Sequence, residues 1–190
     1  KRAAMRVKES ITRFIENTLY LKVNKKKTVV SYVRGVKYLG YSFYVMKGKC
    51  ELTVHPKSKV KMKSRLKELT SRSNGWGYAK RKQKLKEYIR GWVGYYHLAN
   101  MKRLLHETDE WLRRRIRMCI WKAWKRVKTK VANLIRRCIS KYKAYEWGNT
   151  RKGYWRIADS YILHRAVTKE HLCRAGYVTL TGAYLEWHPK

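Results

Sequence analysis

Acidic residues are scarce in this chain. Asp and Glu together number 12, against 48 Lys and Arg, which gives a formal charge of +36 over 190 residues. The acids are scattered along most of the sequence, and the six histidines show no spacing typical of metal ligands. A nuclease or a metal-dependent hydrolase needs clustered acids or histidines at its active site, so the sequence disfavours both.

Paired cysteines are also missing. The four cysteines form no Cys-x-x-Cys motif and are separated by long, irregular gaps; they are Cys50, Cys119, Cys138 and Cys173. This spacing argues against a zinc ribbon and against a disulfide framework. A metal site built from His164, His171 and Cys173 is the weaker alternative to buried thiols in a reducing compartment. We therefore predict no metal ligands in this chain.

No long hydrophobic run and no signal peptide is present. A membrane-spanning helix needs about 20 apolar residues in succession. A membrane surface also attracts basic proteins, but peripheral binding usually depends on a short amphipathic segment or a tail. Here the basic residues extend from one end of the chain to the other, which favours a nucleic-acid partner over a membrane.

The chain has enough apolar residues to fold. Hydrophobic residues make up 44% of the sequence and aromatic residues 13%, so a disordered basic tail is excluded. Eight Trp and 15 Tyr stand against two Phe. Trp and Tyr combine a flat apolar face with a polar group, which suits both core packing and stacking on bases.

The segment 111–130 holds nine Lys or Arg and no acid. Apolar residues run through it at the three-four spacing of a helix that packs one ridge against a core. The ridge consists of Leu105, Thr108, Leu112, Ile116, Cys119, Ala123 and Val127. With most charges on its other faces, this helix would present a dense cationic surface to a phosphate backbone. We expect Glu107, Asp109 and Glu110 to favour the N-terminus of the same helix electrostatically.

The periodicity predicts an α+β fold that is mostly α, with a short antiparallel β section, a basic helical bundle and a small helical C-terminal region. The first expected elements are a helix with the stripe Ala4, Val7, Ile11, Phe14 and Ile15, and strands over 19–23, 28–33, 36–46 and 51–54. The expected helices that follow cover 57–70, 85–96, 101–128, 131–142 and 155–166. A short turn around 169–174 and a β-like segment at 177–180 are expected after them. Glycine inside a helix usually permits the close approach of another backbone, as we expect at Gly91 and Gly94.

Three segments stand in order along the chain. They are Tyr38-Leu39-Gly40-Tyr41, Ile89-Arg90-Gly91-Trp92-Val93-Gly94-Tyr95-Tyr96, and the arginine-rich stretch from Asp109 to Lys125. In this order and spacing they resemble the C-terminal part of group II intron-encoded reverse transcriptases, the maturases. The first is similar to the Phe-Leu-Gly-Phe primer grip that closes the palm of those enzymes. The second is similar to the Arg-Gly-Trp signature of the maturase domain, and the third to the arginine-rich helix of that domain.

The resemblance covers nearly the whole chain and implies three domains. Residues 1–55 would be the end of the palm, 56–125 the thumb or X (maturase) domain, and 126–190 a DNA-binding region. Proteins of this family bind group II intron RNA, assist its splicing, and clamp a template–primer duplex while the intron is copied into a new site (retrohoming). The implied partners are intron RNA, target or template–primer nucleic acid and the upstream palm and fingers, with no membrane. The implied location is the bacterial cytoplasm, in a ribonucleoprotein or near the nucleoid.

The polymerase centre of the family is missing from this chain. There, a Tyr-Ala-Asp-Asp hairpin and a third Asp hold two Mg²⁺ ions. This chain has only Asp109 and Asp159, and neither lies in such a hairpin. We therefore predict no catalytic residue and no cofactor here, and expect Mg²⁺ in an upstream polymerase centre. The chain begins inside a helical stripe without an initiator Met and shows no endonuclease motif, so we expect a piece of a longer, endonuclease-lacking protein.

A thumb holds its duplex through phosphate and sugar contacts, which position without reading sequence, and Arg binds phosphate oxygens with two donors at once. The predicted RNA or template–primer contacts are Arg90, Arg113, Arg114, Arg117, Lys122, Lys125 and Arg126. The predicted primer-grip residues are Tyr38, Leu39, Gly40 and Tyr41, and the predicted DNA contacts are Lys152, Arg156, Arg165 and Lys169. Strand packing is the alternative for the two tyrosines. Three tryptophans at helical spacing are expected in the core rather than on bases: Trp92, Trp111 and Trp124.

A second hypothesis is a stand-alone basic RNA-binding splicing cofactor without polymerase activity. Such a cofactor would also contact RNA through the basic helix, but it would need no polymerase domain. An upstream, in-frame Tyr-Ala-Asp-Asp motif in the coding region would favour the first hypothesis over the second.

Overall fold

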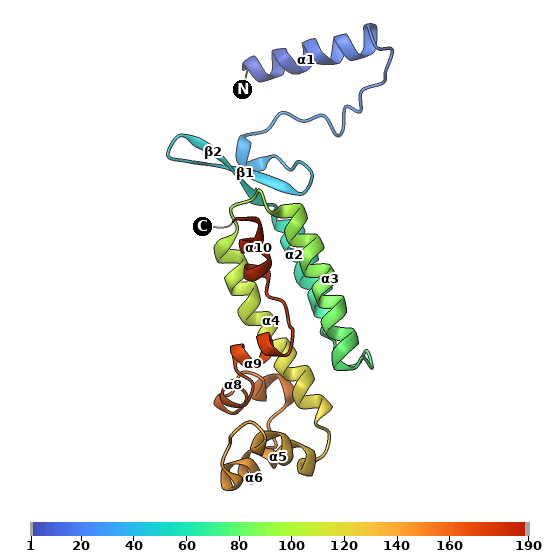
Figure 1. Cartoon of the computed structure of the whole chain (residues 1–190). Coiled ribbons are helices and arrows are strands. Elements are labelled where there is room, and N and C mark those ends of the chain that lie inside the picture. Colours follow the sequence, from blue (N-terminus) through green and yellow to red (C-terminus); the bar gives the residue numbers. More distant parts are fainter. Residues whose placement is uncertain (1, 189–190) are drawn as a thin grey trace. The chain divides into compact units, whose positions relative to one another are not determined.

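The computed structural model describes residues 2–188. It confirms the α+β, mostly α class, since ten helices and one two-stranded antiparallel sheet are formed within these residues (Figure 1). By its contacts the chain divides into two units, Lys1–Thr53 and Val54–Lys190, which we describe separately. The three-domain division implied by the resemblance stays a prediction.

The first unit contains the expected N-terminal helix, α1 (Arg2–Asn17), and the hairpin of β1 (Tyr41–Met46) and β2 (Lys49–Val54). The predicted strands over 19–23 and 28–33 are wrong: these segments are irregular, and only a short 3₁₀ turn, η1 (Val33–Gly35), follows them. Alternating apolar residues form a strand only where a neighbouring strand can pair with them. Within the described residues the sheet contains only β1 and β2.

The predicted strand over 36–46 starts later than expected because a tight turn precedes it. The Tyr38 N–H donates to the Tyr41 carbonyl at 3.1 Å, and the Tyr41 N–H donates to the Tyr38 carbonyl at 2.8 Å. Between them Leu39 and Gly40 have φ values of +49° and +84°. Two successive residues at positive φ are typical of a type I′ turn, in which glycine is favoured because it has no Cβ. The Leu-Gly pair thus sets the start of β1.

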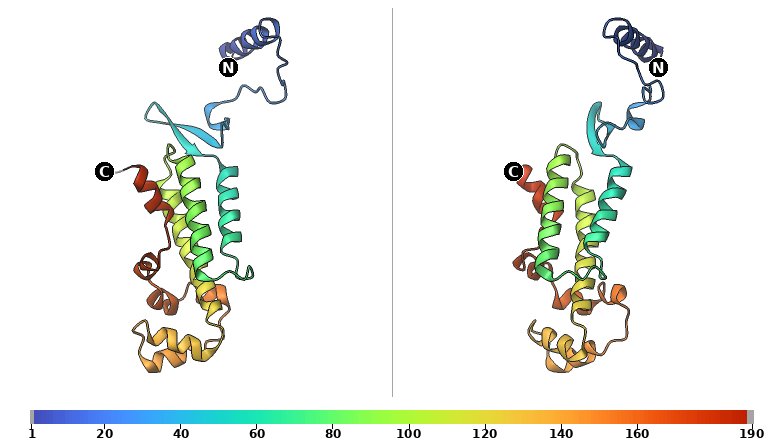
Figure 2. Two further views of the ribbon diagram at one scale, coloured as in Figure 1. Left: turned by 45° about the vertical axis from the view of Figure 1, so that its right-hand side comes forward. Right: turned by 90° about the vertical axis from the view of Figure 1, so that its right-hand side faces the viewer.

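Three long helices form the core of the second unit: α2 (Pro56–Leu69), α3 (Tyr78–Tyr96) and α4 (Lys102–Ala123). They lie side by side in both further views (Figure 2). The α2 helix begins with Pro56, where a missing N–H costs nothing, and the His55 Nδ1 accepts a hydrogen bond from the Lys57 N–H at 3.1 Å. The side chains buried among the helices include Met62, Leu66, Leu85, Ile89, Leu105, Leu112 and Ile116.

The predicted helix over 101–128 is too long. The α4 helix ends at Ala123, and α5 (Val127–Ile135) starts after a break. Ala123 and Val127 are exposed, so the predicted ridge ends early. The core is continued instead by Trp121 and Trp124, whose rings meet edge to face at a centroid distance of 5.7 Å. Burying two indoles removes more apolar area from water than the alanine and valine would.

The C-terminal region is helical but more broken than predicted. After α5, the chain forms α6 (Lys141–Gly148), α7 (Tyr154–Ile157), α8 (Tyr161–Ala166) and α9 (Lys169–Arg174). The predicted helix over 131–142 is interrupted between α5 and α6, and the one over 155–166 between α7 and α8. The predicted β-like segment at 177–180 is wrong: residues 177–179 are irregular, and α10 (Leu180–Trp187) begins at the last position of the segment.

The α10 helix packs on α3 and α4. Its first turn is capped by Asp109 of α4, which is 3% exposed and accepts hydrogen bonds from the Leu180 and Thr181 N–H groups at 2.8 and 2.9 Å. The prediction that Asp109 serves the N-terminus of its own helix is therefore wrong. Gly94 faces the Trp187 ring of α10, 3.5 Å from where a Cβ would lie, whereas a Cβ on Gly91 would meet nothing within 4 Å. The predicted close approach of another backbone is therefore wrong for both glycines, since Gly94 approaches a side chain and Gly91 approaches neither.

Candidate nucleic-acid interface

Most of the charge lies in the second unit, which holds 35 of the 48 Lys and Arg residues and nine of the 12 acids. Several of those acids pair with a cation nearby on exposed helix faces. These pairs are Arg65–Glu68, Lys84–Glu87, Arg103–Glu107 and Arg90–Glu186, the last at 3.9 Å. Such local pairs cannot neutralise the unit, because the cations outnumber the acids almost fourfold. The unit therefore keeps a strong attraction for polyanions.

The middle of α4 directs arginines into the fold. The Arg115 guanidinium donates from Nε to the Thr70 Oγ1 at 2.6 Å, and from Nη2 to the carbonyls of Lys67 and Thr70 at 3.0 and 3.1 Å. These carbonyls end α2, where a cation is favoured by the helix dipole. Burial lowers the pKa of Arg115. The side chain thus ties α4 to the end of α2.

Arg117, a predicted RNA contact, is only 6% exposed. Its Nε donates to the Val167 carbonyl at the end of α8 at 2.9 Å, and its Nη1 lies 3.3 Å from the His164 Nε2. Burial is the main cause that lowers the pKa of Arg117; Arg113 lowers it further, and Asp159 opposes the shift. The expectation that Arg117 lies on an exposed face is wrong, and its guanidinium holds the C-terminal helices instead.

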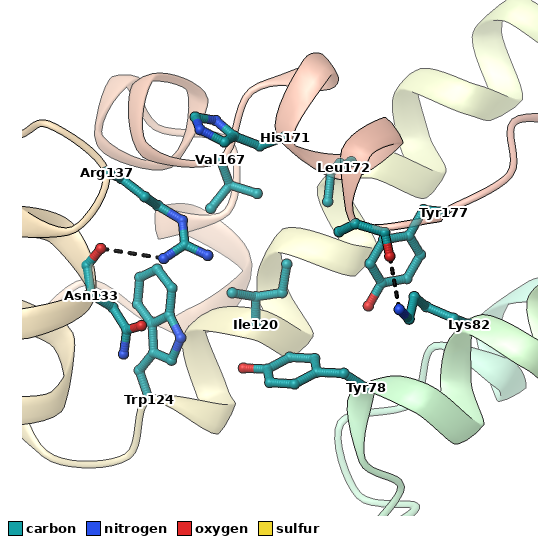
Figure 3. A pocket seen from close by; sticks show the side chains of 11 residues that line it. Tyr78, Lys82, Ile120, Trp124, Asn133, Arg137, Val167, His171, Leu172 and Tyr177 are labelled. Carbon is teal, nitrogen blue, oxygen red and sulfur yellow. Dashed lines mark hydrogen bonds between the residues drawn. The ribbon is translucent and has the colours of Figure 1, made fainter.

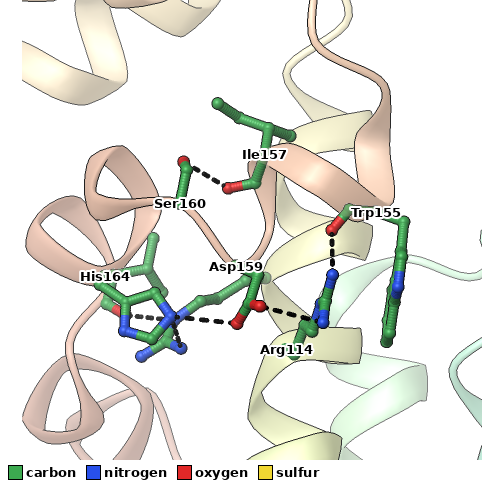
Figure 4. A network of polar contacts seen from close by, with 8 residues as sticks. Arg114, Trp155, Ile157, Asp159, Ser160 and His164 are labelled. Carbon is green, nitrogen blue, oxygen red and sulfur yellow. Dashed lines mark hydrogen bonds and ion pairs between the residues drawn. The ribbon is translucent and has the colours of Figure 1, made fainter.

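Arg114 joins α4 to α7 and the turn that follows (Figure 4). Its Nη1 lies 3.0 Å from the Asp159 Oδ2, and its Nη2 donates to the Trp155 carbonyl at 3.1 Å. The guanidinium also stacks over the Trp155 ring at 3.9 Å from the centroid. Asp159 continues the network to the His164 Nε2 at 3.6 Å. Arg114 therefore has donors committed within the fold.

The remaining predicted contacts differ in exposure. Lys125 and Arg126 are exposed at the break between α4 and α5, while Arg113 is half-buried. Arg90 is exposed, whereas Lys122 is half-buried and donates from Nζ to the Arg72 carbonyl at 2.7 Å. All four predicted DNA contacts are exposed: Lys152, Arg156, Arg165 and Lys169. In the first unit, Tyr38 and Leu39 are 64% exposed, and Gly40 and Tyr41 are half-buried. Contacts of these residues with nucleic acid stay predictions.

The three tryptophans expected in the core differ in burial. Trp124 is buried as predicted, but Trp92 and Trp111 are half-buried. The Arg115 guanidinium lies 5.4 Å from the centroid of the Trp111 ring, and the Arg137 guanidinium 4.9 Å from that of Trp124. Cations over indole rings recur in this unit, and stacking of this kind is also how arginine and aromatic residues contact bases.

A pocket of about 270 Å³ lies where α3, α4, α5 and α9 meet, and sequence reasoning did not detect it (Figure 3). Its buried wall consists of Ile120, Trp124, Val167, Leu172 and Tyr177. Its more exposed rim consists of Tyr78, Lys82, Asn133, Arg137, His171 and Ala175. These residues come from segments up to about 100 positions apart, so no local motif marks them.

Two classes of feature are absent from residues 2–188. No three His, Cys, Asp or Glu side chains gather there as they would around a metal ion. None of the helices formed by these residues has the length and apolar character needed to cross a bilayer.

Residues 59–138 match the family model described as the maturase-specific domain of group II introns. The matched segment runs from the first turn of α2 to just beyond α5, so it includes the basic stretch of α4 and the buried Trp121 and Trp124. It confirms the resemblance for this part of the chain. A search of curated proteins gives no match.

Proposed function

We propose that this chain binds structured intron RNA directly through its exposed cations, since residues 59–138 match the model of the maturase-specific domain of group II introns. The domain indicates a role in group II intron splicing and implies the intron RNA as partner. To this role we add the surface that contacts the RNA, and we place the protein in a bacterial ribonucleoprotein.

The observation that carries the proposal is the excess of exposed cations on a folded helical scaffold. Arg114, Arg115 and Arg117 fasten the helices to one another, so the scaffold is held together partly by its own charges. Other cations, including Lys125 and Arg126, face the solvent. A rigid array of outward cations suits an RNA of fixed shape, because phosphates arrive at set positions.

In the same proposal, the chain clamps a template–primer duplex during retrohoming. The turn of Leu39 and Gly40 would present Tyr38 to the primer strand, and the exposed cations of the C-terminal region would contact target DNA. We assign no catalytic step to this chain. Its two aspartates serve the fold, since Asp109 caps α10 and Asp159 pairs with Arg114.

The first experiment measures binding of the chain to a structured group II intron RNA and to an unstructured RNA of the same length, over a salt series. Counterion release predicts that both affinities fall steeply with salt. We expect the structured RNA to bind more tightly and to keep that preference at high salt. Equal affinities that fall together would contradict the proposal and leave only a non-specific polycation.

A pair of charge-matched variants tests the surface itself. The double variant Lys125→Gln/Arg126→Gln should weaken binding of the structured RNA about fivefold and lower the salt slope by about 2. The control is Arg65→Gln/Lys84→Gln, which removes the same charge from cations already paired with Glu68 and Glu87. Equal effects of the two variants would show that only net charge matters.

A further inference from the structure

We propose that the pocket of Figure 3 receives a single unstacked nucleobase of the bound RNA. This inference rests on the proposed function and adds a defined site to it. A loop or bulge of structured RNA can turn a base out of its stack, and proteins commonly hold such bases between aromatic rings. The pocket offers the surfaces that such a base requires.

Aromatic rings supply the stacking surfaces. Trp124 and Tyr177 are buried in the wall, and Tyr78 stands at the mouth with 42% of its surface exposed. Every base has a flat π-face, so rings of this kind bind bases of any sequence. The cavity of about 270 Å³ is slightly smaller than the usual small-ligand site of about 300–1,000 Å³. It suits one flat heterocycle better than a helix or a strand.

Two polar groups in the pocket have free hydrogen-bonding capacity. The Tyr177 hydroxyl points into the pocket, is buried, and has no hydrogen-bond partner among residues 2–188. A buried hydroxyl without a partner is unfavourable, which indicates that a ligand or water completes it. Asn133 donates one Nδ2 hydrogen to the Thr129 carbonyl at 2.8 Å. A carboxamide has a second hydrogen and an acceptor oxygen, and both can address the edge of a base.

The charges at the rim favour a nucleotide over a neutral or cationic ligand. Arg137 and Lys82 line the pocket, and no carboxylate does. Lys82 donates from Nζ to the Ala175 carbonyl at 2.8 Å, which holds its ammonium group at the rim. The Arg137 Nη1 donates to the Asn133 carbonyl at 3.2 Å, and its Nε has no partner within the described chain. Fixed cations beside an aromatic slot attract the phosphates that flank a base.

The experiment uses the full chain with structured group II intron RNA. Ultraviolet cross-linking followed by mass spectrometry should attach one intron nucleotide to a peptide that carries Tyr78, Trp124 or Tyr177. An RNA that is abasic at that nucleotide should bind the wild-type chain about tenfold more weakly. The Tyr78→Ala variant should lose about as much with normal RNA, and should bind normal and abasic RNA alike.

Matched controls separate the pocket from general effects. Asn133 is compared with Asn149, whose Nδ2 makes the same bond to the carbonyl four residues earlier, at 2.8 Å, but which is no part of the pocket. We expect Asn133→Ala to weaken binding severalfold and Asn149→Ala to leave it unchanged. For Tyr78→Ala the control is Tyr142→Ala, on an exposed face of α6.

The two proposals fail differently. If the wild-type chain shows no preference for structured RNA, the proposed function fails. If that preference holds but no pocket peptide is cross-linked, or if Tyr78→Ala and Asn133→Ala bind as their controls do, the pocket takes no base and this inference is overturned. A pocket filled by a protein segment would also give no cross-linked pocket peptide, and would likewise overturn this inference. Circular dichroism of each variant verifies that it is folded.

Discussion

The middle of α4 and the break that follows it have similar sequences and opposite surroundings. In the middle, Arg115 and Arg117 donate to backbone carbonyls at the ends of α2 and α8. At the break, Lys125 and Arg126 face solvent. The two stretches are equally basic and lie about ten residues apart. Local charge density therefore does not separate a cation that holds the fold from one that is free to bind a partner.

The difference arises from what each side chain can reach. Helix C-termini leave carbonyls without intrahelical partners, and a long arginine can satisfy several of them while its stem packs on apolar surface. The middle of α4 lies against such ends, which makes burial of the charge tolerable. Beyond Ala123 the helix stops, and the side chains of Lys125 and Arg126 face the solvent instead. Mutation of an inward charge should therefore lower the stability of the fold, whereas mutation of an outward charge should lower the affinity for RNA.

The largest loss of stability is expected on mutation of Asp109, a buried anion that points into the fold as the inward arginines do. The variant Asp109→Ala should lower the free energy of unfolding by about 3 kcal/mol, because the Leu180 and Thr181 N–H groups lose their buried acceptor. Chemical denaturation measures the loss. The control is Glu110→Ala, at the next position on an exposed face, which should change stability by less than about 0.5 kcal/mol. Equal effects of the two variants would contradict the assignment of Asp109 as the cap of α10.

The next loss tests the inward arginines. Arg117→Ala should cost about 2 kcal/mol of stability, because the buried Val167 carbonyl loses its donor. Under conditions where the variant is fully folded, its affinity for intron RNA should stay within about twofold of the wild type, since the guanidinium is not on the surface. Lys125→Ala is the converse variant, with unchanged unfolding and weaker binding. A variant Arg117→Ala that remained stable but lost RNA affinity would reverse the comparison.

The sequence predicts most of the fold because helical periodicity is local. The buried positions Met62, Leu66 and Leu69 recur at helical spacing, and α2 forms where they predict it. The errors lie where distant segments decide the structure. The predicted strands at 19–23 and 28–33 lack neighbours to pair with, and the position of Trp124 in the core ends α4 before its periodicity does.

The site is predicted less completely than the fold. The motifs around Arg90, Trp92 and the basic helix pointed to the maturase-specific domain, and residues 59–138 match the model of that domain. The sequence could not show that Arg117 is buried, because its carbonyl partner is 50 positions away. The pocket was missed for the same reason, since Tyr78 and Tyr177 meet only in the folded chain.

The smallest expected effect concerns the Tyr177 hydroxyl, a buried polar group that, unlike Arg117, has no hydrogen-bond partner among residues 2–188. Burial raises the pKa of Tyr177 to about 12, compared with about 10 in an unfolded chain. Between these values the unfolded chain loses the phenolic proton while the folded chain keeps it, so stability falls as pH rises. At pH 11 the loss from this group should be about 1.4 kcal/mol relative to pH 8. The variant Tyr177→Phe has no phenolic proton to lose, so it should not show this loss. The difference in unfolding free energy, variant minus wild type, should therefore increase by about 1.4 kcal/mol from pH 8 to pH 11. A constant difference across this range would mean that the folded chain does not hold the phenolic proton more tightly than the unfolded chain, and would contradict burial as the cause of the raised pKa of Tyr177.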